Sequence, residues 1–469
     1  MPCCTRTTCQ TTTLERPGGA VITCLWLGAG YPLPLSVRVA RPAWSAQPLA
    51  SVRGADTGTV LVTSRHRQRV RTGGAPVLPE GTCSQREWRL EPTVADVAVI
   101  FGGPSPEHDV SVLTGLQAAR ALRSAPSATA GGALRALYWS KTGSWYEVAP
   151  DLEAEAFVEG VPRGASRLEL VARPDGGFVE PGGRLGRSRP VEVEAAVVCC
   201  HGGPGEDGTL QAVLDLCGIA YTGPSVAGAA LGMDKLAFGA LLRANGVPTL
   251  DRLAVSPRDD VPASLPFPGP YIVKPRFGGS SIGIDVVADR DTLVARLGAN
   301  PHFAAGAVVE PYRPDLGDLQ VAVRSWPTLA LSTIERPLRT SGGDILAYRD
   351  KYVAGEGMVA APRELPAELD SSLEAELRRL ALVTARLAGV RGVARLDFLS
   401  DGTELVVNEL NTIPGSLARY LWTDPPVAFA DLLGSLLDEA RRSPTHAYSA
   451  AGADGTVLRS AGSIAAKLG

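Results

Sequence analysis

Apolar and polar residues alternate in two short runs near the carboxyl end of the chain. Within residues 392–415 (GVARLDFLSDGTELVVNELNTIPG), Leu396 and Phe398 alternate with charged residues. Residues two apart on a strand share a face, so the apolar pair and the charged pair point in opposite directions. A tight turn at residues 400–403 separates the two runs, which indicates a β-hairpin.

The polar face of this hairpin predicts a cation site. Arg395 and Asp397 lie on the first strand, and Glu409 and Asn411 lie two apart on the second. Two carboxylates and a carboxamide supply oxygen ligands of the kind that Mg²⁺ prefers when phosphates and water complete its shell. The alternative is a solvated face with an ordinary salt bridge, and these residues alone do not decide between the two.

The turn of the hairpin constrains this interpretation. A regular two-residue turn at Asp401-Gly402 would pair Asp397 with Val406 and would put Glu409 on the opposite face. We therefore expect either an odd-numbered loop, with Gly402 or the next residue at positive φ, or a β-bulge that restores the shared face.

A strand, a glycine turn and a helix follow one another at the start of the ordered part of the chain. Residues 97–101 (VAVIF) have the composition of a buried strand, and Glu107 lies in the first turn of the helix that follows. This order opens a doubly wound α/β unit. The turn lacks the GxGxxG pattern, so dinucleotide binding is poorly supported. Glu107 is either a complement to the helix dipole or a catalytic carboxylate.

A histidine marks the end of a later strand. Residues 195–200 form that strand, and His201 opens a loop that contains four glycines (HGGPGEDGT). Ligands of α/β folds bind at the carboxyl ends of strands, and glycines let a ligand approach the backbone closely. The pattern therefore favours a binding site over a purely structural role. Glu206 either orients His201 or caps the next helix.

Two lysines and a loop rich in glycine and serine indicate phosphate binding. Residues 271–275 (YIVKP) predict a strand that contains Lys274, and residues 276–283 (RFGGSSIG) follow it. Such a loop can wrap phosphate with N–H groups and hydroxyls, although no Walker A pattern is present. Lys274, and Lys235 in a helix predicted over residues 226–245, would supply positive charge. The alternative is a flexible loop with surface lysines, but an unpaired ammonium inside an apolar strand is costly.

The remaining pattern predicts further strands and helices and a lid. Glu310 precedes Pro311, which confines its strand to an edge or to its last residue, and Glu310 either recognises adenine or packs. A polar loop over residues 347–366 is of the kind that folds over a site. The other predicted elements are strands at 308–312, 319–324 and 329–334, and helices at 367–388 and 427–442.

Composition narrows the class of protein. The 469 residues suffice for about three domains, and the net charge of −3 provides no basic field for nucleic acid or an anionic membrane. We find no apolar stretch of about eighteen residues that would span a membrane. The eight cysteines lack metal-ligand or disulfide spacing, which favours a reducing cytoplasm. Residues 1–93 have poor periodicity, and we expect them to be disordered or loosely structured.

Together the motifs resemble the D-alanine–D-alanine ligases of the ATP-grasp superfamily. The resemblance covers roughly residues 94–442 and rests on stretches that stand in family order at family-like separations. These stretches are GGPSPEHDVS (102–111), HGGPGEDGTLQ (201–211), YTGPSV (221–226), MDK (233–235), VKPRFGGSSIG (273–283), DKY (350–352), ARLDF (394–398) and NELNTIPG (408–415).

The resemblance implies an α/β protein with the ATP-grasp fold and an amino-terminal doubly wound substrate domain. Two lobes after that domain would grip ATP between them. The implied divisions are a poorly structured extension at 1–93, the substrate domain at 94–223, the first lobe at 224–307, the second lobe with metal site and lid at 308–442, and a tail at 443–469.

The resemblance also implies roles for individual residues at the nucleotide. Two Mg²⁺ ions, with Mn²⁺ as a substitute, would be held by Asp397, Glu409 and Asn411. The phosphates of ATP would contact Lys235, Lys274, Ser281 and Lys351. The adenine and the ribose would be bound by Glu310 and Asp318.

Further implied roles concern the amino-acid substrates. The first D-alanine would be held by Glu107 and His201, with Glu206 steadying the imidazole. A hydrogen-bonded triad that closes the lid would consist of Glu107, Ser280 and Tyr352. The oxyanion would be stabilised by Arg395 and the Gly415 N–H. The chain departs from the family at Tyr420, which replaces a serine that binds the second carboxylate, and Arg419 is the candidate substitute.

The implied activity is ATP-dependent formation of D-alanyl-D-alanine through a D-alanyl phosphate, for peptidoglycan synthesis. We expect D-alanine and ATP as substrates, no nucleic acid or membrane partner, a homodimer and a cytoplasmic location. A rival is the same mechanism with another amino acid or a hydroxy acid as acceptor, although Tyr352 favours an amine. A nucleotide-binding regulator without catalysis is opposed by the presence of Arg395 and all three metal-ligand positions.

Overall fold

The computed structural model divides the chain into two compact units, Met1–Glu87 and Trp88–Gly469. In the first unit, β1 (Gln10–Arg16) and β2 (Ala20–Trp26) form an antiparallel hairpin, where the sequence predicts no regular structure. The threonines of β1 and the valine, isoleucine and threonine of β2 favour the extended backbone. The described residues are 10–16, 20–26, 96–125, 129, 132–183, 186–338, 362–443 and 449–461.

The second unit begins with an eight-stranded sheet of order β10-β9-β3-β4-β5-β6-β7-β8. Its first four strands are parallel and its other strands are antiparallel. The strands are β3 (Val97–Gly102), β4 (Leu134–Trp139), β5 (Trp145–Val148), β6 (Ser166–Val171), β7 (Gly177–Glu180), β8 (Arg189–Pro190), β9 (Ala195–Val198) and β10 (Ala220–Tyr221). Helices α1 (His108–Ser124) and α2 (Thr209–Cys217) follow β3 and β9, as the glycine turns predict.

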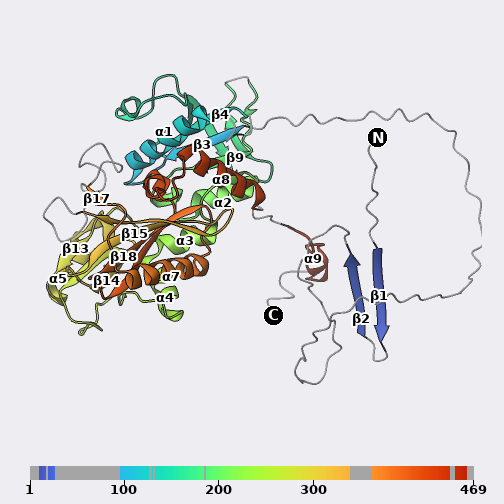
Figure 1. The fold of residues 1–469 in the computed structure, drawn as a ribbon. Coiled ribbons are helices and arrows are strands. Elements are labelled where there is room, and N and C mark those ends of the chain that lie inside the picture. Colours follow the sequence, from blue (N-terminus) through green and yellow to red (C-terminus); the bar gives the residue numbers. More distant parts are fainter. Residues whose placement is uncertain are drawn as a thin grey trace, which may run out of the picture. The chain divides into compact units, whose positions relative to one another are not determined.

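Helix α8 (Phe429–Arg442) packs on this first sheet, although its place in the sequence assigns it to the second lobe. It contacts α1 and β9, and Figure 1 shows it beside β3 and β9. Its apolar face, which includes Leu432 and Leu436, belongs to the same buried cluster as β3. Burial of that face therefore decides where the helix lies.

A four-stranded antiparallel sheet forms the next layer, in the order β11-β14-β12-β13. The strands are β11 (Leu253–Val255), β12 (Tyr271–Pro275), β13 (Asp285–Val287) and β14 (Ala307–Pro311), and α5 (Arg290–Ala299) packs on β13. Because β14 pairs with β12, residues 307–311 belong to this sheet, whereas the sequence assigns residues from 308 onward to the second lobe. Pro311 ends its strand, as expected.

The helix predicted over residues 226–245 is two helices, α3 (Val226–Met233) and α4 (Lys235–Ala244). The break falls at Asp234, whose carboxylate accepts hydrogen bonds from the N–H groups of Leu236 and Ala237. This cap satisfies donors at the start of α4. Lys235 is therefore the first residue of a helix, beside the site described below.

A five-stranded antiparallel sheet completes the described fold, in the order β17-β16-β15-β18-β19. Its elements are β15 (Gly317–Arg324), β16 (Ala330–Pro337), β17 (Arg363–Glu364), α7 (Ser371–Leu387), β18 (Val393–Ser400) and β19 (Leu405–Asn411). Short 3₁₀ segments lie at η2 (Ala154–Phe157), η3 (Gly203–Gly205), η4 (Pro301–Phe303) and η5 (Gly415–Leu421), and α9 (Thr456–Ala461) is the last described helix. The architecture is the α/β arrangement of sheets and helices that the sequence predicts.

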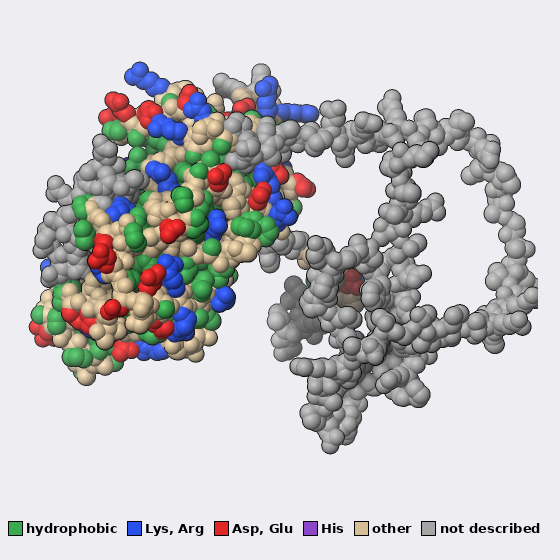
Figure 2. Space-filling view, in the orientation of Figure 1, with side chains coloured by type: hydrophobic (Ala, Val, Ile, Leu, Met, Phe, Trp, Pro, Cys, Tyr) green, Lys and Arg blue, Asp and Glu red, His purple; other side chains and the backbone are tan. Residues whose placement is uncertain are grey.

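On the face that Figure 2 shows, basic and acidic side chains are interspersed over the described residues. Across the described ranges, we find no helix with the length and apolar character needed to cross a membrane.

We predict that Gly115→Ala destabilises the protein because α1 lies directly against β3. A Cβ atom at Gly115 would lie 2.4 Å from the Cβ of Phe101. Overpacking of this kind lowers the free energy of unfolding by about 1–3 kcal/mol, measurable by urea unfolding. Gly298→Ala in α5 is the control, because nothing lies within 4 Å of its Cβ position. It should raise stability by up to about 1 kcal/mol through helix propensity. Equal stability of the two variants would contradict this packing.

Candidate active site

A β-bulge at Asn408 sets the register of the β18–β19 hairpin. Phe398 pairs with Val407, whereas Asp397 pairs with Glu409, so Asn408 is an extra residue on β19. The loop has four residues, 401–404, with Gly402 at φ 96°. Without the bulge, this even-numbered loop would put Glu409 on the opposite face from Asp397. The expectation that a bulge or an odd loop restores the shared face is confirmed.

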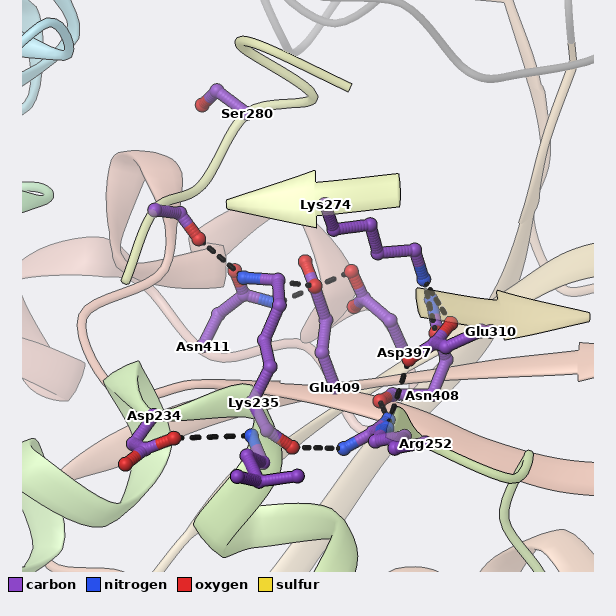
Figure 3. Close-up of polar contacts among 12 residues, drawn as sticks. Asp234, Lys235, Arg252, Lys274, Ser280, Glu310, Asp397, Asn408, Glu409 and Asn411 are labelled. Atoms are coloured by element: carbon purple, nitrogen blue, oxygen red, sulfur yellow. Dashed lines mark hydrogen bonds and ion pairs between the residues drawn. The ribbon is translucent and has the colours of Figure 1, made fainter. Parts of the chain in front are cut away.

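The polar face of the hairpin is organised around Asp397. Arg395 donates to both of its carboxylate oxygens, at 2.7 and 2.8 Å, and Asn411 donates to one at 3.1 Å. The Nζ atom of Lys235 lies 3.6 Å from Oε2 of Glu409 (Figure 3). No group of three His, Cys, Asp or Glu able to hold a metal occurs among the described residues. Two carboxylates and one amide oxygen nevertheless fit a hard divalent cation whose remaining ligands are phosphate oxygens and water.

A cavity of about 870 Å³ adjoins this face. Apolar side chains such as Leu250 and Ile272 line part of it, which suits a flat aromatic base. Of the residues that the sequence assigns to metal and nucleotide, this cavity is lined by Lys235, Lys274, Ser281, Glu310, Asp318, Asp397 and Glu409. The remaining nucleotide residue, Lys351, lies outside the described residues.

Glu310 is fully buried and held between two cations. Arg252 Nε donates to one oxygen at 2.8 Å and Lys274 Nζ to the other at 2.6 Å. Burial alone would raise the pKa of Glu310, but the charges of Lys274 and Arg252 outweigh it and lower that pKa. Sequence reasoning assigned Glu310 to adenine and missed Arg252. The available signal was a lone arginine just before a short apolar run, LAV.

The glycine- and serine-rich loop has an unusual backbone. Ser280 and Ser281 have φ values of 53° and 60°, in the left-handed region that side chains other than glycine rarely adopt. Such strain is common at ligand-binding loops, where successive N–H groups form a concave anion site. The Ser280 hydroxyl donates to Glu107. The third member of the predicted triad, Tyr352, and most of the predicted lid lie outside the described residues.

A second cavity of about 580 Å³ contains the residues predicted to bind the first amino acid. Glu107, His201, Glu206, Ser280, Arg395 and Gly415 line it, together with Asn411. Lys235, Gly278, Gly279 and Glu409 line both cavities. The two cavities therefore meet at the glycine- and serine-rich loop and the polar face of the hairpin.

His201 is fixed by two hydrogen bonds. Its Nδ1 lies 2.7 Å from the carbonyl oxygen of Ile413, which can only accept, so Nδ1 carries the proton. Its Nε2, 2.8 Å from the Thr114 hydroxyl, then accepts from that hydroxyl, which in turn accepts from the Ser416 N–H at 3.1 Å. Burial lowers the pKa of His201 to about 4, so the ring is neutral. Sequence reasoning missed Thr114, which is one of many polar residues on an amphipathic helix.

Glu206 does not steady the imidazole as predicted. Its carboxylate accepts from the N–H groups of Gly202 at 2.8 Å and Ile413 at 2.9 Å, and from the Thr412 hydroxyl at 3.2 Å. It therefore joins the His201 loop to the end of the hairpin through the backbone. Burial, and then the charge of Glu107, raise the pKa of Glu206 to about 7.

The segment after the hairpin is a left-handed turn. Ser416, Leu417 and Ala418 all have φ of 50°, although none is a glycine. Left-handed backbone costs about 1–2 kcal/mol per residue, so the surrounding contacts must hold the turn in place. The bond from the Ser416 N–H to Thr114 is one of these contacts.

Arg419 does not line the second, smaller cavity. Its guanidinium lies over the ring of Phe429, 5.4 Å from the centroid. Arg363 instead lies over the ring of Tyr420 at 4.6 Å and pairs with Glu335 at 2.8 Å. Burial raises the pKa of Tyr420 to about 12. Arg363 and Glu335 escaped sequence reasoning because their strands, β16 and β17, flank the predicted lid.

Comparisons with known proteins agree with this arrangement. The family models "D-ala D-ala ligase N-terminus" and "D-ala D-ala ligase C-terminus" match residues 96–224 and 241–438. A D-alanine–D-alanine ligase of Acidiphilium cryptum (strain JF-5) is 33% identical over 321 residues, covering 68% of this chain and 88% of its own length. One of Prochlorococcus marinus (strain MIT 9313) is 32% identical over 364 residues, covering 74% and 98%.

The fold is also similar to a solved structure. The crystal structure of the D-alanine–D-alanine ligase from Helicobacter pylori superposes with a TM-score of 0.58 and 23% identity, covering 75% of this chain and 100% of that one. Both family matches begin after residue 95, so the extension expected at residues 1–93 lies outside them.

We predict opposite effects of Glu206 and His201 on stability as pH changes. Glu206 has a folded pKa of about 7 against an ordinary 4.5, so the folded state binds more protons between these values and stability falls as pH rises. His201 has a pKa of about 4 against 6.5, so its contribution rises with pH in that window. The two contributions offset each other.

Glu206→Gln removes one of these contributions. Its unfolding free energy, measured with urea at several pH values, should therefore rise more steeply than the wild type between pH 4.5 and 6.5. The lost hydrogen bond should lower the whole curve as well. Curves that are merely displaced and parallel would contradict the raised pKa of Glu206.

Proposed function

The chain belongs to the D-alanine–D-alanine ligase family, and on that premise we propose that it joins two D-alanine molecules into D-alanyl-D-alanine for peptidoglycan synthesis, converting ATP to ADP and phosphate. One observation carries this proposal: the two cavities share Lys235, Gly278, Gly279 and Glu409. A nucleotide in the larger cavity and a carboxylate in the smaller one would meet at that shared wall.

The first step transfers a phosphoryl group to a carboxylate. An oxygen of the first D-alanine attacks the γ-phosphorus, the bond to the bridging oxygen breaks, and ADP leaves. Asp397, Glu409 and Asn411 would hold a divalent cation, which would neutralise charge at the phosphates. We assign Lys235, Lys274 and Ser281 to the phosphates because they line the cavity. The resemblance to the family adds Lys351 to this proposed role.

The second step forms the amide bond. The amine of the second D-alanine attacks the acyl carbon, loses a proton and expels phosphate. Arg395 and the Gly415 N–H line the smaller cavity and are suited to stabilise the oxygen that becomes negative. Arg395 is positioned for this because its bidentate contact with Asp397 fixes the guanidinium plane.

Two charged groups suit the first D-alanine. Glu107 lines the smaller cavity and is suited to the ammonium, while Arg395 is suited to the carboxylate. His201 is neutral and both ring nitrogens have partners, so it shapes the cavity wall. We place Ser280 in a positioning role, since its hydroxyl holds Glu107, and we assign Tyr352 to the same network.

The finer assignments extend this proposal. We propose two Mg²⁺ ions, replaceable by Mn²⁺, on the ligand set of the hairpin, with Asp318 at the ribose. A homodimer and a cytoplasmic location remain part of the proposal. Metal titration, light scattering and fractionation would test these three points, and one ion per site, a monomer or an exported protein would contradict them.

The second candidate function keeps the mechanism and changes the acceptor. It is favoured by Tyr420, whose bulk and neighbour Arg363 differ from the serine expected there. We retain D-alanine because Tyr352 favours amine acceptors in the resemblance stated above.

Product analysis tests this choice. We predict that the protein, with ATP, Mg²⁺, D-alanine and equimolar D-lactate near neutral pH, makes mostly D-alanyl-D-alanine, as identified by mass. ADP release should depend on D-alanine. Asp397→Asn should abolish release, because the substitution removes a carboxylate that holds the metal. Predominance of the depsipeptide would overturn the acceptor, and ADP release that ignores D-alanine would overturn the ligase itself.

Two arginines distinguish where the second carboxylate binds. We predict that Arg363→Ala raises the KM for the acceptor by about tenfold, since an ion pair in a water-poor site is worth about 1.5–3 kcal/mol. Arg419→Ala is the matched control and should leave that KM within about twofold, because its guanidinium faces Phe429. Steady-state kinetics at saturating donor measure both. A larger effect at Arg419 would restore the expectation from the sequence.

A further inference from the structure

Arg252, directly before β11, contacts three parts of the nucleotide cavity that are far apart in the sequence. Its Nε donates to Glu310 at 2.8 Å, its Nη1 to the carbonyl oxygen of Lys235 at 2.5 Å, and its Nη2 to that of Asn408 at 2.5 Å (Figure 3). The side chain is only 4% exposed. It does not line the cavity itself, so it lies behind the residues that would meet the nucleotide.

Each of the three partners has a position that matters to the reaction. Lys235 is the first residue of α4 and lies 3.6 Å from Glu409. Asn408 is the bulge residue that sets the register of Glu409. Glu310 is the counter-ion of Lys274. One planar guanidinium therefore joins the phosphate lysines to the metal-binding strand.

The charges around Glu310 suggest why Arg252 is needed. One carboxylate faces two cations, Arg252 and Lys274, so the cluster carries one surplus positive charge. When phosphates draw Lys274 toward the nucleotide, Arg252 alone can keep buried Glu310 neutralised. Without Arg252, Glu310 would retain Lys274, because an uncompensated buried carboxylate is costly.

A glycine in the facing helix makes room for this side chain. A Cβ atom at Gly239 of α4 would lie 2.6 Å from Arg252 Cδ and 2.7 Å from its Nη1. Glycine weakens a helix interior relative to alanine. The close approach of Arg252 is a physical reason for a glycine at this position.

We propose that Arg252 is a positioning residue for phosphoryl transfer: it holds the Asn408 bulge and the start of α4 in register, and it frees Lys274 for the nucleotide phosphates. This inference rests on the proposed function. A lysine cannot replace it, because the three acceptors require the forked, planar donors of a guanidinium.

Arg252→Met tests the proposal in the full chain by calorimetry with Mg²⁺ and ADP. The affinity for ADP in the presence of Mg²⁺ should fall about tenfold or more, as for other residues that orient metal ligands. Arg391→Met is the matched control, because Arg391 also donates to backbone carbonyl oxygens, those of Tyr221 and Gly223, and lines neither cavity. It should lower the melting temperature and leave ADP affinity within about twofold.

Kinetics separate positioning from general damage. Arg252→Met should raise the KM for ATP and the Mg²⁺ concentration for half activation, while the KM for the first D-alanine stays within about twofold. Arg252→Lys should bring neither the KM for ATP nor the Mg²⁺ concentration for half activation close to its wild-type value. ADP binding needs no amino acid, so it can be measured apart from ligase activity. If the wild-type protein showed no ligase activity while Arg252→Met still weakened ADP binding, the proposed function would be rejected and the role proposed for Arg252 would be kept.

Gly239→Ala provides a second variant in case Arg252→Met does not fold. It displaces Arg252 without removing the charge, and it should weaken ADP binding in the presence of Mg²⁺, with Gly298→Ala as the helix control. If Arg252→Met folds, adding Gly239→Ala to it should weaken ADP binding little further. ADP affinity within about twofold of wild type in a folded Arg252→Met or Gly239→Ala protein would overturn the proposal.

Discussion

The inserted residue Asn408 is the constraint on which the rest of the site depends. A strand alternates its faces with every residue, so one extra residue reverses the side on which everything beyond it lies. The bulge puts Glu409 and Asn411 on the same face as Asp397. The four-residue loop without the bulge would have placed both on the opposite face. Without that register, Lys235 would lack its acidic neighbour and the two cavities would lose one of the residues they share.

The charged groups of the site form ion pairs with one another, and a charged ligand could take the place of a protein partner in such a pair. Asp397 is held by Arg395, and Glu310 by Lys274 and Arg252. Burying any of these charges alone would be costly, so the pairs keep the fold stable before substrates arrive. In the proposed reaction, phosphates at Lys274 would replace Glu310 with a partner of the same sign, while Arg395 stays on Asp397. The same residues can therefore serve both stability and catalysis.

Sequence reasoning predicted the fold class, most element positions and the need for an odd-numbered loop or a bulge, because periodicity and glycine turns are local signals. It failed where the deciding contacts are remote in the sequence. It read α3 and α4 as one helix because the cap at Asp234 looks like any polar residue, and it could not place α8 on the first sheet. In the site, the named residues that the structure describes line the cavities, except Arg419 and Tyr420, but several of their partners differ from those expected. Arg252, Thr114 and Arg363 lie on distant elements, and only Arg252 carries a weak local signal.

The smaller cavity shows what this difference means for substrate recognition. The pKa values of His201, about 4, and Glu206, about 7, leave the first neutral and the second close to half-protonated near neutral pH. Both side chains form hydrogen bonds to other groups of the protein, and both join the His201 loop to the end of the hairpin at Ile413. Among the charged residues that line this cavity, Glu107 and Arg395 are suited to a zwitterion, whereas Lys235 and Glu409 lie on the wall shared with the larger cavity. An amino acid bound between them would turn its carboxylate toward Arg395, and therefore toward the polar face of the hairpin, which is the orientation that the proposed phosphoryl transfer requires.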